Sequence, residues 1–202
     1  VLVENALGTF RTLLDEVTLH PCMGVYLTHM NNPKSDGERN TYPDENYARE
    51  VMQLFTIGLY ELNLDGTRKV DDNGDFIPTY SHDDISEFAK VFTGLSWADS
   101  EQFGRNAPSD TSYTQPMKMY NGYHEPGAKW LLNGFIVPNR NPPDGIADIN
   151  NAIDNLFSHP NVGPFIAKRL IQRLVTSNPS PGYIERVAKR FNDNGQGIRG
   201  DM

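Results

Sequence analysis

Cysteine, positive charge and long apolar runs are all scarce in this sequence. A single cysteine, Cys22, among 202 residues excludes an internal disulfide and any metal site that needs several cysteines. Acidic residues outnumber basic ones by 26 to 18, and the formal net charge of −8 argues against a general nucleic-acid binder. No apolar run approaches the roughly 20 residues that a membrane-spanning helix requires. We therefore expect no transmembrane segment in this chain and no nucleic acid as its partner.

Several catalytic and metal-binding motifs are also missing. His124 and the glutamate after it resemble the start of a zinc-protease motif, but the second histidine, four residues on, is replaced by Ala128. An acidic run that starts at Asp71 resembles a calcium loop, yet its sixth and twelfth positions hold Phe76 and His82, where glycine and glutamate are required. There is no Gly-x-Ser-x-Gly motif and no glycine-rich phosphate loop. The sequence therefore predicts no metal site, and the cofactor, if there is one, is unknown.

The stretch Pro43–Gly58 has the strongest helical pattern in the chain. At 100° per residue its apolar side chains fill a wide sector, which is typical of a central helix contacted from several sides. Asp44 is the expected N-cap, since its carboxylate can accept a hydrogen bond from the first turn. We expect this helix to be the buried hub of the fold. The helices predicted to pack around it cover residues 4–20, 81–94 and 161–176.

Glu50 is the exception on that helix, because the helical wheel places it between Ile57 and Leu54, inside the apolar sector. An unpaired carboxylate there would be costly and would tend to take up a proton or a partner. Glu50 is therefore the first candidate for a functional residue. The alternative is a buried glutamate that an arginine or backbone amides satisfy for structural reasons, and we favour that alternative.

The remaining pattern predicts a mainly α fold. Helical spacing recurs near the start of the chain and through most of its last third. Asn73-Gly74 lies between two short strand-like runs and predicts one small β-hairpin at about 67–80. Residues 98–144 lack periodicity and predict a long irregular loop. We expect a single multi-helix, bundle-like domain over residues 1–202, and, because the sequence has no initiator Met and both ends look cut, a fragment that lacks N- and C-terminal parts.

The exposed positions of the last third are markedly basic. They are Lys168, Arg169, Arg173, Arg186, Lys189 and Arg190. In an acidic chain such a cluster is either a docking patch for an acidic partner or polymer, or the solvated face of two helices. We favour the solvated face, and we keep Arg169 and Arg173 as candidate binding residues.

Several long motifs together resemble a bacterial domain-of-unknown-function family, numbered eighteen hundred. They include PDENYAREVMQLFTIGL at 43–59, DISEFAKVFTGLSW at 84–97, YHEPGAKWLLNG at 123–134, and HPNVGPFIAKRLIQRLVTSNPSP at 159–181. The resemblance covers essentially the whole chain. It implies a mostly α-helical domain of an exported, secreted bacterial protein, located in the periplasm or outside the cell. It also implies a possible partner for protein binding, a second uncharacterised exported family, numbered fifteen hundred and one, whose genes commonly lie beside those of the first.

One hypothesis for the function is a hydrolase or lyase that acts on an extracellular polymer. Its acid and base would be paired carboxylates, Glu45 or Glu50 with Glu125. The supporting side chains would be His124, Lys129 and Arg49, with Trp97, Tyr123 and Trp130 as sugar platforms. A metal site of His124, Glu125 and Glu50 has no supporting spacing.

The competing hypothesis is a non-catalytic scaffold or binding module that acts with a partner protein at the cell envelope. In this case Glu50 and Arg49 fasten the interior, and the 98–144 segment is a partner surface. The candidate binding residues are Glu45, Asn46, Arg49, Trp97, Lys129, Arg169 and Arg173. We favour this hypothesis, because no catalytic group of residues satisfies a strict geometric specification. Convergence of Glu50, His124 and Glu125 on one open pocket would instead favour an enzyme.

Overall fold

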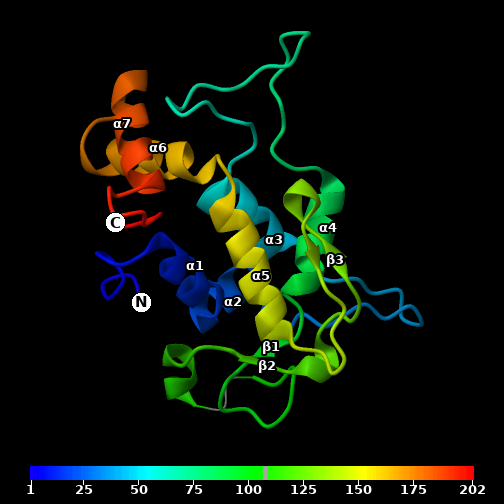
Figure 1. The fold of residues 1–202 in the computed structure, drawn as a ribbon. Helices are drawn as coiled ribbons and strands as arrows, with labels where there is room; N and C mark the ends of the chain where they lie inside the picture. The colour runs from blue at the N-terminus through cyan, green and yellow to red at the C-terminus, as the bar shows by residue number, and fades with distance from the viewer. Residues whose placement is uncertain (107–108) are drawn as a thin grey trace. The chain divides into compact units, whose positions relative to one another are not determined.

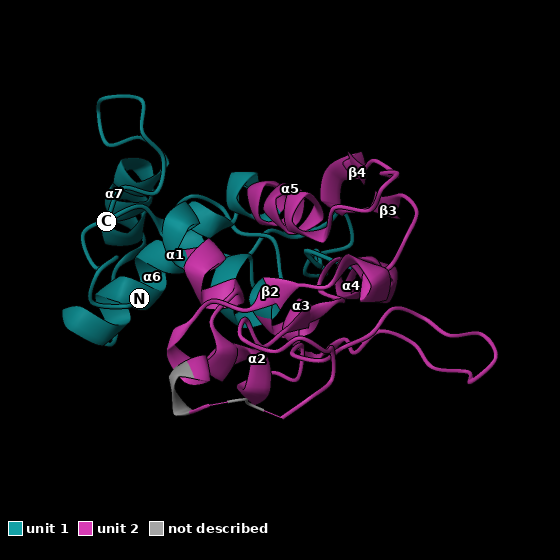
Figure 2. Ribbon diagram, turned by 90° about the horizontal axis from the view of Figure 1, so that it is seen from below, with its two compact units in different colours: residues 1–13, 51–81, 156–202 teal, residues 14–50, 82–155 magenta. Residues whose placement is uncertain are grey.

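The computed structural model describes residues 1–106 and 109–202, and within them it has two compact units. Unit 1 contains residues 1–13, 51–81 and 156–202, and unit 2 contains residues 14–50 and 82–155 (Figure 2). Each unit is described by itself below. The expectation of a single domain stays a prediction.

The mainly α class is confirmed, since seven α-helices carry most of the regular structure of the described residues (Figure 1). The helices are α1 (Phe10–Thr18), α2 (Pro21–Tyr26), α3 (Asn46–Glu50), α4 (His82–Val91), α5 (Gly145–Ser158), α6 (Val162–Leu174) and α7 (Pro181–Asn192). A π-helix, η1 (Val51–Thr56), follows α3, and three 3₁₀ turns are η2 (Asp110–Thr114), η3 (Asn121–Tyr123) and η4 (Leu132–Gly134). None of the helices among these residues is long and apolar enough to cross a membrane.

Two small antiparallel sheets complete the regular structure of the residues that the structure describes. Strand β1 (Leu95–Ser96) pairs with β2 (Lys118–Met119), and β3 (Lys129–Trp130) pairs with β4 (Ile136–Val137). Most of these strands lie in the segment 98–144 that was expected to be irregular, and in its described part the longest helical turn has five residues. At the predicted hairpin the chain does reverse, with Gly74 at φ +89° and a Val70–Phe76 bridge, but the pairing there is made of isolated bridges rather than strands.

The predicted central helix is confirmed in position but not in geometry. It begins as α3 and widens into the π-helix η1, where the Thr56 hydroxyl donates to the Val51 carbonyl at 2.6 Å. Gly58 then adopts φ +72°, and its N–H donates to the carbonyl of Met52. A wider turn shifts the angular position of the side chains that follow it. For this reason Leu54, predicted on the buried sector, is 51% exposed.

The boundary between the units falls inside this element, between Glu50 and Val51. In unit 2, α3 packs against α4, and Tyr47 of α3 exchanges a hydrogen bond of 2.7 Å with Thr18 of α1. In unit 1, η1 packs against α6. Each of the three helices that were expected around the hub therefore contacts part of it.

Unit 1 is fastened by the side chain of Asn161, which is 1% exposed. Its amide nitrogen donates to the carbonyls of Ile57 and Tyr60, both at 2.8 Å, and its carbonyl oxygen accepts from the N–H of Leu62 at 2.9 Å. The segment after Gly58 has no regular ladder partner for these groups. A single asparagine therefore satisfies three backbone groups that would otherwise be buried without partners.

The core of unit 2 contains a stack of His29 on Tyr47, with ring centroids 3.9 Å apart, and Phe92 meets Tyr47 edge-on at 4.8 Å. The Nε2 atom of His29 donates to the Thr18 carbonyl at 2.9 Å, because a carbonyl only accepts. Burial lowers the pKa of His29 from 6.5 to about 4, although the Thr18 hydrogen bond and the Asp44 carboxylate partly oppose this. His29 is therefore neutral in the folded unit near pH 7.

We expect Asn161→Ala to lower the free energy of unfolding of unit 1 by about 2–4 kcal/mol, since three backbone groups lose their partner inside the protein. The midpoint of urea unfolding measures the loss. Asn178 is exposed, so Asn178→Ala serves as a control with an expected change within about 0.5 kcal/mol. Equal effects of the two substitutions would show that the Asn161 clamp is not needed.

We expect unit 2 to lose stability as the pH falls below 6.5, because the unfolded chain then binds a proton at His29 that the folded unit excludes. The contribution is complete above pH 6.5 and is lost progressively toward pH 4, by up to about 3 kcal/mol. Urea unfolding between pH 4 and pH 7.5 measures this slope. His29→Gln, which cannot titrate, should flatten it relative to His20→Gln, and an unchanged slope would contradict the assignment.

Candidate functional site

The three residues expected to form a catalytic centre lie in unit 2 in three different environments. Glu50 ends α3, and its Oε2 atom is buried without a hydrogen-bond partner among the described residues. His124 is buried, and Glu125 is half-buried with its carboxylate turned toward Ser35. Within the described part of the chain, no hydrogen bond or ion pair joins Glu50 to either of the others. Glu50 also has no arginine partner there, so the expected internal fastening of Glu50 is not found.

His124 belongs instead to a buried ionic cluster, which we define as His124, Lys129, Arg140 and Asp148. The Nζ atom of Lys129 lies 2.6 Å from Asp148 Oδ2, and His124 Nε2 lies 3.1 Å from the same oxygen. Arg140 pairs with the other carboxylate oxygen, Oδ1. The Nδ1 atom of His124 donates to the Thr93 carbonyl at 3.0 Å. One carboxylate on the first turn of α5 therefore faces three basic side chains.

The ammonium group of Lys129 lies among polar groups of the protein interior. It lies within hydrogen-bond distance of Asp148, of the Glu125 carbonyl at 2.7 Å and of His124 Nε2 at 3.2 Å. Burial raises the pKa of Asp148, but hydrogen bonds from His124 and Lys129 and the charge of Lys129 outweigh this, so the pKa lies below its ordinary value. The carboxylate is therefore ionised near neutral pH and compensates the buried ammonium.

The histidine, lysine and aspartate of the buried ionic cluster are closed to a substrate, whereas the Arg140 side chain is 25% exposed. Lys129 and His124 are each 1% exposed, and the lysine already donates to Asp148 and to the Glu125 carbonyl inside the protein. A general acid or base must come within hydrogen-bond distance of the reacting group, directly or through one water. The cluster can hold backbone segments together, but in this arrangement it cannot reach a polymer in solution.

Residues 123–125 connect the buried ionic cluster to the surface. His124 turns inward, whereas the Tyr123 side chain is exposed and its carbonyl accepts from the N–H of Lys34 at 2.8 Å. The Glu125 carboxylate accepts from the N–H of Ser35 at 2.6 Å and from its hydroxyl at 2.8 Å. Glu125 N–H in turn donates to the Thr93 hydroxyl. The position of Lys34 and Ser35 therefore depends on a segment whose middle residue is fixed in the interior.

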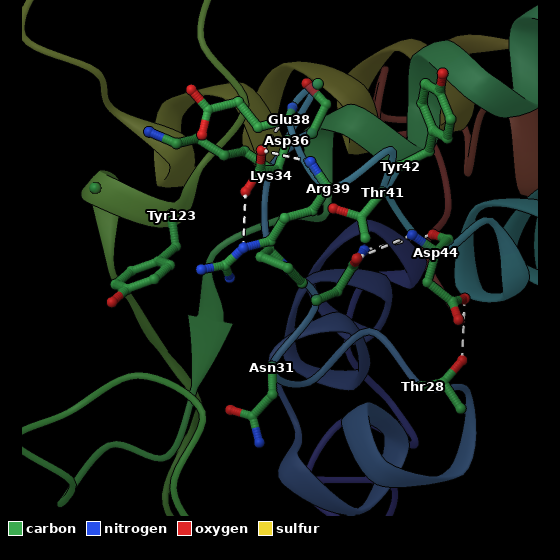
Figure 3. A pocket seen from close by; sticks show the side chains of 15 residues that line it. Thr28, Asn31, Lys34, Asp36, Glu38, Arg39, Thr41, Tyr42, Asp44 and Tyr123 are labelled. Atoms are coloured by element: carbon green, nitrogen blue, oxygen red, sulfur yellow. Dashed lines mark hydrogen bonds and ion pairs between the residues drawn. The ribbon is translucent and has the colours of Figure 1, made fainter.

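A large open groove lies at this place. It has a volume of about 1020 Å³ and is lined by residues of the 28–44 segment together with Gly122 and Tyr123; we call it the 28–44 groove (Figure 3). Tyr123 lies on one side of it, and Thr28 and Asp44 lie on the other (Figure 3). The 28–44 segment forms a loop that projects from the rest of unit 2 (Figure 2). Its tip is a hairpin-like turn, in which Asp36 and Thr41 exchange backbone hydrogen bonds of 3.0 and 3.1 Å.

The base of the loop is held by Asn32 and Asp44. The N–H of Asp44 donates to the side chain of Asn32 at 2.9 Å, and the Asp44 carboxylate accepts from the Thr28 hydroxyl and from the N–H of Asn46. Asp44 therefore holds the start of α3, as its predicted capping role requires. Asn46 contributes to the same contacts, since its amide donates to the Thr28 hydroxyl at 3.4 Å.

The other residues predicted from the polar stripe of the central helix fasten α3 to α4. Glu45 accepts a hydrogen bond of 2.7 Å from Ser86 and pairs with Arg49 at 3.1 Å. His82 lies 4.0 Å from the same carboxylate. Arg49 contacts Glu45, four residues before it, and its expected role as an internal fastener stays a prediction. Among the described residues, the Glu45 carboxylate forms no hydrogen bond or ion pair with a residue that lines the 28–44 groove.

The remaining predicted binding residues lie elsewhere. Trp97 is buried and meets Tyr113 edge-on at 4.9 Å, so it cannot act as a sugar platform on the surface. Arg169 and Arg173 are exposed on α6 of unit 1. Trp130 is exposed in unit 2, outside the lining of the 28–44 groove. The described residues contain no group of three or more His, Cys, Asp or Glu side chains that could hold a metal ion.

Sequence reasoning missed both Asp148 and the 28–44 groove. Asp148 could have been found by the spacing of Asp148, Ala152 and Asn155, which places an acidic residue on the buried face of a predicted helix. The groove had a weaker signal. A polar loop with Pro33 and Gly37 is typical of any exposed connection.

We expect Asp148→Asn to lower the free energy of unfolding of unit 2 by about 3–5 kcal/mol, because it leaves the Lys129 ammonium without a counter-charge. Lys129→Met should be costly as well, and the double variant should lose less than the sum by at least about 1 kcal/mol. Urea unfolding of all four proteins measures this coupling. Arg39→Met, which removes an exposed ion pair, is the control and should cost less than about 1 kcal/mol. Additive effects would contradict the coupling.

Comparison with known proteins gives one match, which confirms the resemblance found in the sequence. The family described as "Protein of unknown function (DUF1800)" matches residues 1–201. No curated protein and no solved structure matches the chain. Because the match extends over nearly every residue, the chain belongs to the DUF1800 family.

Proposed function

We propose that this protein is a non-catalytic binding module whose 28–44 groove receives a segment of a partner protein. One contrast carries the proposal: His124 and Lys129, which could take part in acid and base chemistry, are buried in the ionic cluster, whereas polar and aromatic side chains line an open groove beside it. A protein that binds a partner needs an open groove whose side chains can contact that partner, and it does not need an accessible acid or base.

The lining of the groove suits a polypeptide. Its charges are mixed, with Lys34 and Arg39 beside Asp36, Glu38 and Asp44, which favours a partner that carries both signs. Its aromatic side chains, Tyr42 and Tyr123, are exposed. Tyrosine supplies much contact area at a small cost in side-chain entropy and is enriched in protein interfaces. The volume of about 1020 Å³ is at the upper end for small-molecule pockets, which also favours a larger ligand.

We propose the cell envelope, in the periplasm or outside the cell, as the place where this binding occurs. The resemblance to exported bacterial proteins supports this, as does the frequent neighbourhood of genes for the second family, numbered fifteen hundred and one. A member of that second family is the partner that we propose. Fractionation of cells that produce the full-length protein tests the location, because a cytoplasmic protein would contradict it.

The alternative function, a hydrolase or lyase that cleaves an extracellular polymer, is less well supported than binding. It would need Glu50, His124 and Glu125 at one accessible pocket, with two carboxylates flanking the bond that is cleaved. His124 is 1% exposed, and the carboxylate of Glu125 is occupied by Ser35. We therefore prefer a binding function for unit 2.

We expect replacement of both Tyr42 and Tyr123 by alanine to weaken binding of the partner by at least about tenfold, because aromatic side chains at the centre of an interface carry much of its free energy. Biolayer interferometry with the purified partner, encoded beside this chain, measures the dissociation constant. Thermal melts of the variant should lie close to those of the unchanged protein, since both side chains are exposed, with a small loss because the Tyr123 ring stacks on that of Phe103 at 4.1 Å.

Tyr26→Ala is the matched control. Tyr26 belongs to unit 2 and is 76% exposed, as is Tyr42, but it does not line the 28–44 groove. Its replacement should leave the dissociation constant within about twofold. Undiminished binding by the groove variant would show that the groove is not the docking site, and absence of binding by the unchanged protein would contradict the proposed partner.

A further inference from the structure

A second cavity, in unit 1, is surrounded by positive charge. It has a volume of about 340 Å³ and lies between the segment 53–68 and α6. Its lining contains Arg68, Lys168 and Arg169, and no aspartate or glutamate is among its lining residues. The complete chain has a net charge of −8, so three cations around one cavity without a carboxylate are unlike its average surface.

None of these three side chains forms an ion pair with a carboxylate of residues 1–106 or 109–202. Neighbouring basic residues behave differently: Lys69 pairs with Glu61 at 3.0 Å, and Lys189 pairs with Glu185 at 2.6 Å. Unit 1 therefore has carboxylates within reach of other cations but leaves these three around the cavity uncompensated.

Aromatic rings hold the two guanidinium groups in place. The Cζ atom of Arg68 lies 4.7 Å from the ring centroid of Tyr60 and 4.8 Å from that of Phe76. Arg169 lies 5.0 Å from the ring centroid of Phe165. A stacking contact fixes the plane of a guanidinium without using its N–H groups. The donors of both arginines therefore stay available for a ligand.

Such a pair of arginines is suited to an oxyanion. A guanidinium donates two parallel hydrogen bonds to a phosphate or carboxylate, and these bonds are stronger than those between neutral groups. Lys168 adds a third charge as a point cation. A dianion with three equivalent oxygens makes better use of three cations than a single carboxylate does. The amides of Gln53 and Gln172 in the same lining could bind hydroxyl groups beside the anion.

We propose that this cavity binds a phosphate group, either as free phosphate or as the phosphate ester of a small polar molecule. The volume is near the lower end for ligand pockets, which suits a compact ligand such as a sugar phosphate. The site is independent of the proposed function, because all of its lining residues belong to unit 1 and those of the 28–44 groove belong to unit 2.

Isothermal titration calorimetry of the complete chain with inorganic phosphate, glucose 6-phosphate and glucose tests the proposal. We expect saturable binding of at least one of the two phosphates, weakened by added sodium chloride, and no binding of glucose. Tighter binding of the ester would identify an organic phosphate as the ligand, and equal binding would identify phosphate itself. No saturable binding of either phosphate, or equal binding of glucose, would overturn the proposal.

Two substitutions in the cavity and one control outside it test where the phosphate binds. Arg68→Gln and Arg169→Gln should each weaken it by at least about tenfold, since each removes a charged pair of donors. Arg186→Gln is the matched control, because Arg186 also lies over a ring, that of Tyr183 at 5.7 Å, but outside the cavity. It should leave binding within about twofold.

Lys168→Gln tests the cavity with a substitution that should not affect folding. The side chain of Lys168 makes no hydrogen bond or ring contact in the described residues, so its replacement removes a charge with little effect on packing. We expect at least a threefold loss of affinity with an unchanged thermal melt. If all three cavity variants bind as the unchanged protein does, the phosphate site does not exist.

Discussion

The buried pair of Lys129 and Asp148 is the interaction on which much of unit 2 depends. A lysine that is 1% exposed is stable only if its charge and its three protons are matched from inside the protein. That requirement brings together β3, which carries the lysine, the first turn of α5, which carries the aspartate, and the backbone at Glu125. The segment between them has little regular structure. Side-chain chemistry, and not a long ladder of backbone hydrogen bonds, determines where this segment lies.

The consequence reaches the surface through three consecutive residues. His124 is held by the buried ionic cluster and by the Thr93 carbonyl, so the residues on either side of it have little freedom. Tyr123 and Glu125 then fix Lys34 and Ser35 at one wall of the 28–44 groove. A binding surface on a loop gains affinity when the loop is organised before the ligand arrives, because less conformational entropy is lost on binding. In the proposed binding function the buried charges would act by positioning the groove wall, since they cannot contact the ligand. In unit 1 an uncharged side chain also fixes an irregular segment, since Asn161 forms hydrogen bonds with the backbone on both sides of Gly58.

The helices could be predicted from the sequence, whereas the contacts between polar groups could not. Periodicity depends on residues within one or two turns, and it predicted helices where α1, α3, α4 and α6 lie. The counter-ion of Lys129 lies 19 residues away in sequence, so no local pattern reveals that the lysine is buried. Glu50 shows the opposite failure. Its place on the wheel indicated burial, and one oxygen is indeed buried, but the pattern carried no information about a partner. The widening of the helix into η1 also lies beyond a wheel drawn at a constant angle.

The two surfaces differ in the kind of electrostatics that they offer, and this difference limits what each can bind. The 28–44 groove carries both signs of charge, so its selectivity arises from the pattern of charges and from two tyrosines, and salt should affect it modestly. The charged residues that line the cavity of unit 1 are all cations, and aromatic rings lie against its two guanidinium groups, so the cavity favours an anion, which would compete with dissolved salt. A neutral polymer would satisfy neither surface. Charge therefore distinguishes the two proposals, a protein partner for unit 2 and a small anion for unit 1.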